Sequence, residues 1–341
     1  MDFQGFKIGI AKIDDLSSIM KFISHEWSSD HILSQDKDFF LYQYGNKENL
    51  NFIVAKDGLG SISATLGFIP SSADKKSQIF TTMWKVSKNS PSATLGLKLF
   101  SYLQDLNLGP LMSVGINEKT EEIYKFLRLH VGSLDQYFIV NRNLHKFQMA
   151  KFSKKILQDT QKTGYKSDRI AGFIEPKTLE KFLFYDNSSK KDYSFVKRRY
   201  CSHPYFDYKF LGVFDNTNMV SSMVLREVCY KNSRALRIID YFGEECFLAD
   251  FTMFLKQLMT NTPYEYIDFF CYGFQEQNLL NAGFNKVSDS DLITVIPDHF
   301  DPFIKEKYII KFFAPKDMVN GLKVFKGDGD QDCPRRPQDL S

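Results

Sequence analysis

Up to residue 142, apolar positions follow two spacings that succeed one another along the chain. Alternation every second residue is typical of a strand, and recurrence every three or four residues is typical of an amphipathic helix. A turn at Lys56-Asp57-Gly58 separates two of the expected strands. The pattern predicts strand 6–11, helices 14–25 and 35–44, strands 51–55, 61–69 and 79–86, helix 94–106, strand 111–116, helix 118–129 and strand 136–141.

The second half of the chain shows the same order of elements, which indicates an internal repeat of one fold plan. The halves are too different to be aligned by eye, so the repeat is inferred from element order. The stretch 143–166 between them is polar and rich in lysine, and is interpreted as a linker or surface crossing. The predicted elements are helices 175–184 and 193–200, strands 208–214, 219–229 and 234–242, helix 247–259, strand 264–272, helix 276–282 and strand 292–297.

Composition narrows the class of protein. A length of 341 residues suggests two domains, and 43% hydrophobic with 25% charged residues is typical of a soluble globular protein. The net charge of +3 argues against nucleic-acid binding, and the apolar runs are too short for a membrane span. No signal peptide is evident, and the five cysteines form no CxxC pair. We therefore expect a cytoplasmic protein with reduced thiols, either a monomer or a homodimer.

Two junctions between strands and helices carry the chemical signal. Strand 111–116 leads into Asn117, and the next helix places Tyr124 seven residues later, two turns along the same face. Upstream, strand 79–86 runs into PSATLGLKLF, a Ser/Pro/Gly turn that opens an amphipathic helix. These features resemble the acetyl-coenzyme A half of the GNAT N-acetyltransferase superfamily. In that family the second kind of junction holds the pyrophosphate, Asn and Tyr flank the thioester, and the Tyr often acts as general acid.

The resemblance implies an α/β (α+β) fold with two tandem GNAT-like domains. Each is expected to have a mixed, mostly antiparallel sheet, flanked by helices and splayed between its fourth and fifth strands. We expect a catalytic domain that binds acetyl-coenzyme A at 1–145 and a linker at 146–166. A degenerate GNAT-like domain at 167–315 would complete the acceptor site, and a polar tail would follow at 316–341.

The first half is the better candidate for the cofactor. Residues 90–96 include no carboxylate, and Gly96 permits close backbone approach to a pyrophosphate. The loop departs from the family pattern R/Q-x-x-G-x-G/A, because Pro91 and Thr94 replace the first two expected residues. At the same junction of the second half, Glu244 and Glu245 would oppose a pyrophosphate. The resemblance implies cofactor binding by Trp84, Lys85, Val86, Ser92, Ala93, Thr94, Leu95, Gly96 and Asn117.

The acceptor side of the superfamily corresponds here to the loop 27–33. Trp27 suits stacking on a sugar face, and Asp30 or His31 suits proton removal from an ammonium group. With Tyr124 as acid, these two complete the predicted catalytic set; the alternative is a helix cap with His31 on the surface. The predicted acceptor contacts are Trp27, Phe68, Thr82, His203, Arg226 and Asp240. Salt bridges between domains explain Arg226 and Asp240 equally well.

The ending GDGDQDCPR at 327–335 is similar to a calcium loop but is followed by Pro and Arg in place of an acidic ligand, so no metal site is expected. It also resembles the GDGDQDRP ending of tandem GNAT-like proteins from bacterial surface-polysaccharide clusters, with Cys333 inserted. The segment DHILSQDKDFFLYQY resembles that group too. The resemblance implies acyl transfer from acetyl-coenzyme A, or another short acyl-coenzyme A, to a nucleotide-linked amino sugar.

Two alternatives stay open. A Fem-type peptidyltransferase would use aminoacyl-tRNA and need a basic surface, which the net charge of +3 does not favour. A non-catalytic GNAT-like binding module is compatible with the altered pyrophosphate loop.

Overall fold

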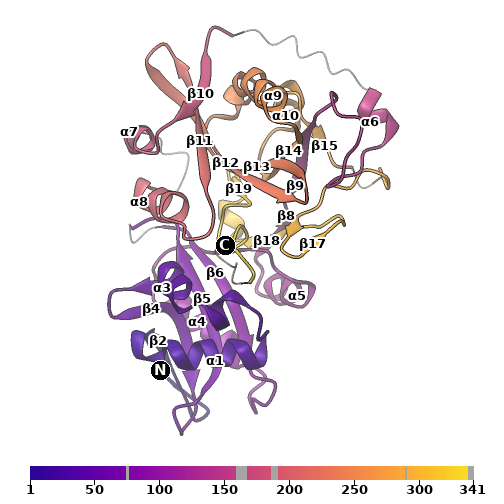
Figure 1. Cartoon of the computed structure of the whole chain (residues 1–341). Helices are drawn as coiled ribbons and strands as arrows, with labels where there is room; N and C mark the ends of the chain where they lie inside the picture. The colour runs from indigo at the N-terminus through magenta and orange to yellow at the C-terminus, as the bar shows by residue number, and fades with distance from the viewer. Residues whose placement is uncertain (74–76, 159–166, 186–190, 289, 337–341) are drawn as a thin grey trace. The chain divides into compact units, whose positions relative to one another are not determined.

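The computed structural model describes residues 1–73, 77–158, 167–185, 191–288 and 290–336 (Figure 1). The chain forms two compact units. Unit 1 comprises Met1–His130, Phe313–Lys316 and Gly329–Ser341, and unit 2 comprises Val131–Phe312 and Asp317–Asp328. Each unit has its own mixed sheet flanked by helices, as the sequence predicts.

Unit 1 is built on a sheet with strand order β1-β2-β4-β5-β6-β7, and β3 pairs with β4. Its β6 and β7 are parallel, whereas β2, β4, β5 and β6 pair antiparallel in that order. The strands are β1 (Asp2–Phe3), β2 (Phe6–Lys12), β3 (Gly45–Asn46), β4 (Asn49–Lys56), β5 (Ile62–Pro70), β6 (Ile79–Val86) and β7 (Leu111–Val114). The helices are η1 (Ile13–Asp15), α1 (Leu16–Glu26), α2 (Ile32–Gln35), α3 (Lys37–Tyr44), α4 (Leu95–Asp105) and α5 (Glu118–Phe126).

Helices cover both faces of β6. Because neighbouring side chains of a strand point to opposite faces, Thr81 and Thr82 lie on different sides of the sheet. The Thr82 hydroxyl bonds to the Tyr44 hydroxyl of α3 at 2.9 Å. Thr81 lies on the side of Tyr124, whose ring is 6.1 Å from that of Phe100 in α4. Burial on both faces explains why β5 and β6 are apolar without strict alternation.

Unit 2 has the strand order β10-β11-β12-β13-β14-β9-β15, with β19 also beside β14. Its strands are β9 (Asp135–Val140), β10 (Ile170–Ile174), β11 (Tyr208–Asp215), β12 (Asn218–Tyr230), β13 (Ser233–Gly243), β14 (Tyr264–Tyr272), β15 (Asn285–Lys286) and β19 (Val324–Phe325). A separate two-stranded sheet joins β16 (His299–Phe300) and β17 (Phe303–Ile304). The boundaries of the units fall within β8 (His130–Ser133), β18 (Lys311–Ala314) and η4 (Lys316–Met318).

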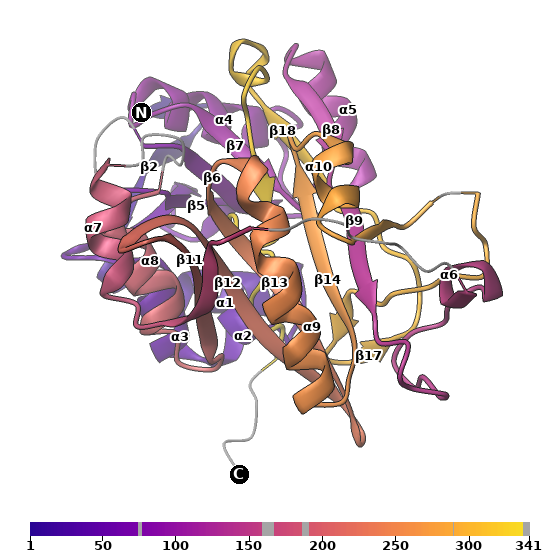
Figure 2. The ribbon, with the colours of Figure 1, turned by 90° about the horizontal axis from the view of Figure 1, so that it is seen from above.

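The helices of unit 2 follow the predicted order. Figure 2 shows α9 running along β13 and β14, where Leu255 and Met259 join the main apolar core. The helices are α6 (Lys154–Gln158), α7 (Thr178–Tyr185), α8 (Tyr193–Val196), the π-helical turn η2 (Lys197–Cys201), the 3₁₀ helix η3 (Glu245–Phe251), α9 (Thr252–Asn261) and α10 (Glu276–Asn281). The predicted strand 292–297 is wrong, because there the structure forms an isolated bridge between Lys151 and Val295.

Strand 136–141, expected in the first domain at 1–145, belongs to the second sheet instead. β9 pairs antiparallel with β14 and β15 in the second sheet, where the Gln136 amide donates to Asp268 at 3.1 Å. In unit 1, the end of β18 at Phe313 and Ala314 supplies strand instead, and β18 follows β7 in the strand order. The pattern of apolar side chains shows which faces of a strand are buried, but it does not show which sheet the strand joins.

The described part of the expected linker is packed against unit 2. Met149 and Ala150 are buried, and their backbone N–H groups donate to the Glu265 carboxylate of β14 at 2.9 and 3.2 Å. Gln148 donates its N–H to the same carboxylate at 2.6 Å. These bonds satisfy a charge that is otherwise expensive to bury. The stretch 146–158 is therefore part of unit 2 and not a solvated linker, while 159–166 lies outside the described residues.

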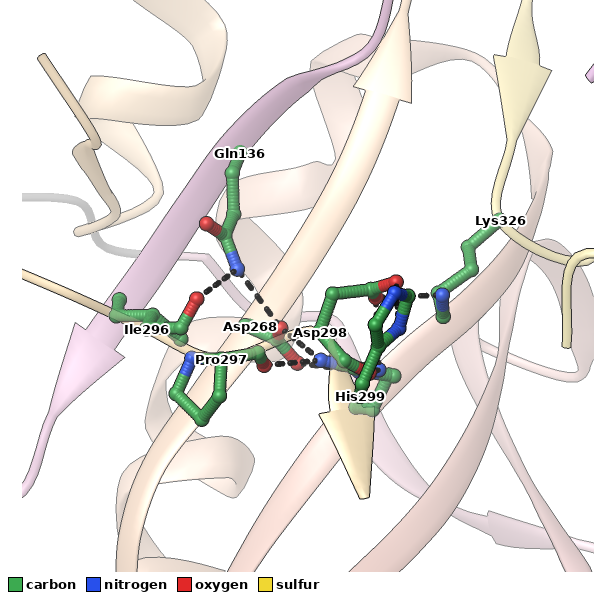
Figure 3. Close-up of polar contacts among 8 residues, drawn as sticks. Gln136, Asp268, Ile296, Pro297, Asp298, His299 and Lys326 are labelled. Carbon is green, nitrogen blue, oxygen red and sulfur yellow. Dashed lines mark hydrogen bonds and ion pairs between the residues drawn. The ribbon is translucent and has the colours of Figure 1, made fainter. Parts of the chain in front are cut away.

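Part of the expected polar tail is buried in unit 2, where the stretch 324–328 has no exposed residue. Figure 3 shows Asp268, Asp298 and Lys326 close together. Arg237 of β13 bonds to Asp268 at 3.0 and 2.8 Å and to Asp298 at 3.1 Å. Lys326, directly after β19, reaches Asp298 at 2.6 Å. Burial alone would raise the pKa of Asp298, but Lys326, His299 and Arg237 hold it well below its ordinary value. The network therefore keeps Asp298 ionised inside the protein.

A second buried ion network holds the next residues of the tail. Lys191 contacts Asp240 at 2.7 Å and Asp328 at 2.6 Å, and the Tyr200 hydroxyl donates to Asp240 at 2.7 Å. The Gly327 N–H donates to the carbonyl of Ile239 at 2.8 Å. The prediction of a polar tail from 316 is wrong for this segment, because polar sequence becomes core once each charge has a partner.

Candidate active site

The parallel pairing of β6 and β7 is short. It covers Ile79 with Leu111 and Phe80 with Met112. Side chains then replace the backbone ladder: the Thr81 hydroxyl donates to the Met112 carbonyl at 3.1 Å, and the Ser113 hydroxyl donates to the Thr81 carbonyl at 2.7 Å. β6 continues to Val86, whereas β7 ends at Val114. The two strands therefore separate at the point where the sequence predicts a splayed sheet.

A bulge in β6 follows directly. Thr65 of β5 is opposite Lys85 and Gly67 is opposite Thr82, so two residues of β6 face one residue of β5. Within the bulge Met83 has a φ of 44°, a conformation that a methionine rarely adopts. The Thr65 hydroxyl donates to the Met83 carbonyl at 3.2 Å. After this bulge, the Trp84 indole N–H donates to the Gly96 carbonyl at 3.2 Å, which joins the end of β6 to α4.

The first turn of α4 is open to a ligand. Thr94 stands at the N-cap without a side-chain capping bond, and the buried Ser92 hydroxyl has no hydrogen-bond partner within the described part of the chain. A Cβ on Gly96 would lie 3.1 Å from Val86 Cγ2 and 3.2 Å from Trp84 Nε1, so glycine allows the helix to approach β6. Free N–H groups and the positive end of the helix dipole together suit an anion. Ala93 and Thr94 are exposed there.

Glu26 is a neighbour of this loop that sequence reasoning missed. Its carboxylate accepts from the Ser87 hydroxyl at 2.6 Å and from the Lys88 N–H at 3.2 Å. These hydrogen bonds lower the pKa of Glu26, with the Ser87 bond as the largest cause. The contact ties the end of α1 to the end of β6. Ser87 and Glu26 are 61 positions apart in the sequence, so the spacing of residues could not predict that they are in contact.

Tyr124 lies in an aromatic cluster. Its side chain is 2% exposed, and its ring stacks on Phe313 with centroids 3.9 Å apart and lies 5.7 Å from the ring of Trp84. Burial raises the pKa of Tyr124 above its ordinary value, and a hydrogen bond with Thr81 acts in the opposite direction. The phenol therefore keeps its proton at neutral pH. Phe313 was not expected here, because it comes from the strand that enters unit 1 from the far end of the chain.

Asn117 caps α5. Its side-chain carbonyl accepts from the Thr120 N–H at 3.0 Å, in the position where Asn is favoured at a helix start. Asn117 therefore has a structural role as the N-cap of α5, independent of any ligand. The predicted cofactor residues Trp84 and Gly96 are brought into direct contact, whereas the carbonyl of Asn117 is occupied by the cap.

The acceptor-side loop exposes Trp27 and Asp30. The ammonium group of Lys85 lies 6.0 Å from the centroid of the Trp27 ring, which is 48% exposed. His31 caps α2, and its Nδ1 accepts from the Leu33 N–H at 3.2 Å. Burial, and then the charge of Arg335, lower the pKa of His31 to about 4. With Nδ1 accepting from Leu33, the neutral ring carries its proton on Nε2, where it can donate a hydrogen bond, and it is a weak base at neutral pH.

The remaining acceptor candidates of unit 1 are buried. Thr82 bonds to the hydroxyl of Tyr44, which also accepts from the Gln43 amide at 3.1 Å, and Phe68 is 4% exposed. Tyr44 was missed as part of this wall, because its spacing marks it only as a helix residue on an apolar stripe.

The candidates in unit 2 make local contacts. Asp240 is fully buried and bonds to Lys191 and Tyr200, so its ion pair lies within one unit and not between domains. The Arg226 guanidinium lies 4.1 Å from the centroid of the Phe206 ring. Nδ1 of His203 accepts from the backbone N–H of Phe206 at 3.0 Å.

The corresponding junction of unit 2 lacks the features of an anion site. The helix starts as η3, and Glu245 accepts from the Gln275 N–H at 2.7 Å. Glu244 also borders a cavity of about 440 Å³, together with Phe182 and Met219. Acidic side chains at the start of η3 and beside this cavity disfavour a phosphate ligand.

Comparison with known proteins identifies the fold. No family model matches the chain, and no curated protein matches it in sequence. A GCN5-related N-acetyltransferase from Anabaena variabilis is 10% identical with a TM-score of 0.54, over 91% of this chain and 72% of that chain. The chain has the GNAT fold. The predicted fold class, two mixed α/β sheets flanked by helices in a GNAT-like arrangement, is confirmed.

Two further structures share the GNAT fold. A probable N-acyltransferase of unknown function from Enterococcus faecalis is 3% identical with a TM-score of 0.53, over 90% of this chain and 72% of that chain. The glucosamine N-acetyltransferase region of a fungal multi-domain GH3 β-N-acetylglucosaminidase is 12% identical with a TM-score of 0.51. That match covers 92% of this chain and 38% of the fungal chain. At such identities the likeness describes the fold alone.

The described residues also bear on metal binding, membrane insertion and thiol chemistry. The described residues include no group of three or more His, Cys, Asp or Glu side chains placed to hold a metal ion. Among the described helices, none has the length and hydrophobicity needed to cross a bilayer. All five cysteines are free thiols.

Proposed function

We propose that unit 1 transfers an acetyl or related short acyl group from coenzyme A to an amine. The observation that carries this proposal is the buried Ser92 hydroxyl without a partner beside the uncapped start of α4. Residues 92–96 would hold the pyrophosphate through N–H groups, and Trp84, Lys85 and Val86 would contact the adjoining arm. Acetyl-coenzyme A supplies the acyl group as its thioester.

Tyr124 is proposed as the general acid. Its buried phenol keeps a proton that can pass to the sulfur as the carbon–sulfur bond breaks. An acceptor that arrives as an ammonium ion first loses one proton, and Asp30, exposed on the loop, is the proposed acceptor of it. The neutral amine then forms the new bond to the acyl carbon and loses a second proton, which restores the phenol of Tyr124. His31 is proposed to donate a hydrogen bond through Nε2, because its Nδ1 already accepts from Leu33.

For the acceptor we propose the amine of a nucleotide-linked amino sugar used in surface polysaccharide. The exposed indole of Trp27 suits a sugar ring, and the ending at 327–335 resembles that of proteins from such clusters. The fungal structure, described as a glucosamine N-acetyltransferase region, supports the same acceptor class. Asp240 is not proposed as an acceptor contact, because its carboxylate is already bonded within unit 2.

Calorimetry with acetyl-coenzyme A on the full chain tests this proposal. Ala93 is exposed in the loop, so Ala93→Glu adds a charge without disturbing packing, and Ala93→Gln is the neutral control of the same shape. We expect Ala93→Glu to weaken binding at least about tenfold at low salt, with the loss shrinking as salt screens the charge. Ala93→Gln should stay close to the parent. No binding by the parent would remove the proposed activity, and equal affinities of the two variants would remove the loop from the site.

A non-catalytic GNAT-like binding module is the second candidate. It is favoured by the ring of Phe313 stacked on Tyr124 and by the use of Asn117 as a helix cap. Such a module would bind acetyl-coenzyme A or an amino sugar but release no thiol when both are supplied. The two candidates therefore separate in a thiol-release assay on the same preparation.

A further inference from the structure

The C-terminal segment 329–336 belongs to unit 1, although the sequence places it after unit 2. The Ile32 N–H of α2 donates to the Arg335 carbonyl at 2.9 Å. The Cys333 thiol donates to the Gln43 side-chain carbonyl of α3 at 3.2 Å. The segment is thus attached to the two helices that follow the predicted acceptor loop.

Gln331 lies against the end of β7. Gly115, the first residue after this strand, has a φ of 86°, and a Cβ placed on it would overlap the Gln331 side-chain amide. Both facts require glycine at this position. No hydrogen bond of the Gln331 amide occurs within the residues that the structure describes, and the residue is half-buried. The Gln331 amide, which can both donate and accept, is therefore available to a ligand. It lies against Gly115, two positions before Asn117.

The same segment places the carboxylate of Asp330 close enough to Tyr44 to affect its pKa, and Tyr44 bonds to the predicted acceptor contact Thr82. Burial, and then the charge of Asp330, raise the pKa of Tyr44 well above its ordinary value. The Tyr44 hydroxyl bonds to Thr82 at 2.9 Å, so Asp330 acts on the wall where the acceptor was predicted.

We propose that the C-terminal segment forms one wall of the acceptor site of unit 1 and that the Gln331 amide binds the acceptor. The ligand class is a polyhydroxylated amine, since an amide can accept from an amine or hydroxyl and donate to a hydroxyl or ring oxygen. This inference rests on the acyl transfer proposed above. It assigns acceptor specificity to a residue at the far end of the chain from Tyr124.

The test uses the full chain, with acetyl-coenzyme A and a panel of UDP- and dTDP-linked amino sugars, plus free glucosamine. Gln331→Ala should raise the acceptor KM about 3- to 10-fold, the effect of one lost hydrogen bond. The acetyl-coenzyme A Kd and the Tm should match the parent. Gln257→Ala, at an exposed position of α9 in unit 2, is the matched control. Gly115→Ala, which displaces Gln331, should raise the acceptor KM as well.

The outcomes separate the two proposals. If the parent acetylates a probe and Gln331→Ala keeps its acceptor KM, the inference is overturned while the acyl transfer stands. If the parent binds no acetyl-coenzyme A, the proposed activity fails, and the segment is then judged by direct calorimetric binding of the same amino sugars. Binding by the parent that weakens in Gln331→Ala supports the wall. No binding of any probe by the parent overturns it.

Discussion

Tyr124→Phe is the most informative single substitution, because it removes one oxygen and keeps the ring. Phe313 at 3.9 Å and Trp84 at 5.7 Å would still contact that ring. The hydrogen bond with Thr81 is lost, but the Thr81 hydroxyl keeps its bond to the Met112 carbonyl at 3.1 Å. We therefore expect a loss of about 1 kcal/mol in the free energy of unfolding. Removing the whole ring with alanine would cost about 3–5 kcal/mol.

The effect on the reaction should be larger than the effect on stability. Loss of a general acid typically slows a reaction by about 10²–10⁴-fold, and we expect kcat to fall at least about tenfold. The acetyl-coenzyme A Kd should change little, because the ring and the loop 92–96 remain. Thiol release with the amino-sugar panel measures kcat, calorimetry measures the Kd, and urea unfolding measures stability.

Tyr230→Phe supplies the matched control, since Tyr230 also stacks on a phenylalanine, Phe303, at 3.8 Å, but in unit 2. An unchanged kcat in Tyr124→Phe would take Tyr124 out of the mechanism and leave it as a packing residue. Alkaline unfolding gives a second check. Burial holds the pKa of Tyr124 above its ordinary value of 10.0, so its contribution to stability is complete below pH 10 and falls as the pH rises further.

Three further predictions follow from the buried charges and the acceptor loop. Asp268→Ala leaves Arg237 without its main partner and should lower the free energy of unfolding by about 3–5 kcal/mol in urea titrations, with the acetyl-coenzyme A Kd unchanged in the folded protein. Because the folded state depresses the pKa of Asp298, its contribution is complete above about pH 4 and is lost as the pH falls through the folded value; a Tm that stays level from pH 6 to pH 3 would contradict this. The pKa of His31 is about 4, so replacing it with Gln, which keeps a side-chain donor, should leave the pH profile of kcat/KM unchanged between pH 6 and 8; a limb near pH 6.5 that vanishes in the variant would show that His31 titrates there.

The order of local elements could be predicted from the sequence, because strand and helix spacing depend on neighbours in the chain. Strands 79–86 and 264–272 have the predicted bounds, and the helices after them were expected within a few residues. The turn that opens α4 and the pair Asn117 and Tyr124 were found in the same way. The expected helix 35–44 begins at Lys37, because Asp36 caps α3 and accepts from the Phe39 N–H at 2.8 Å, a bond that ends α2 before it.

Only the tertiary structure decided which sheet each strand joins and which distant residues reach the site. β9 follows the elements of the first half in sequence but pairs in the second sheet. Phe313 and the segment 329–336, near the C-terminal end of the sequence, belong to unit 1. A hydrophobic pattern records that a side chain is buried but not against what, since the hydrophobic effect has no direction. Charged residues such as Arg237 and Lys326 are expected at the surface from sequence alone. They are buried here because the fold places carboxylates from distant parts of the chain beside them. The covering of Tyr124 by Phe313 and the placing of Gln331 on Gly115 depend on contacts of that kind, for which spacing along the sequence holds no information.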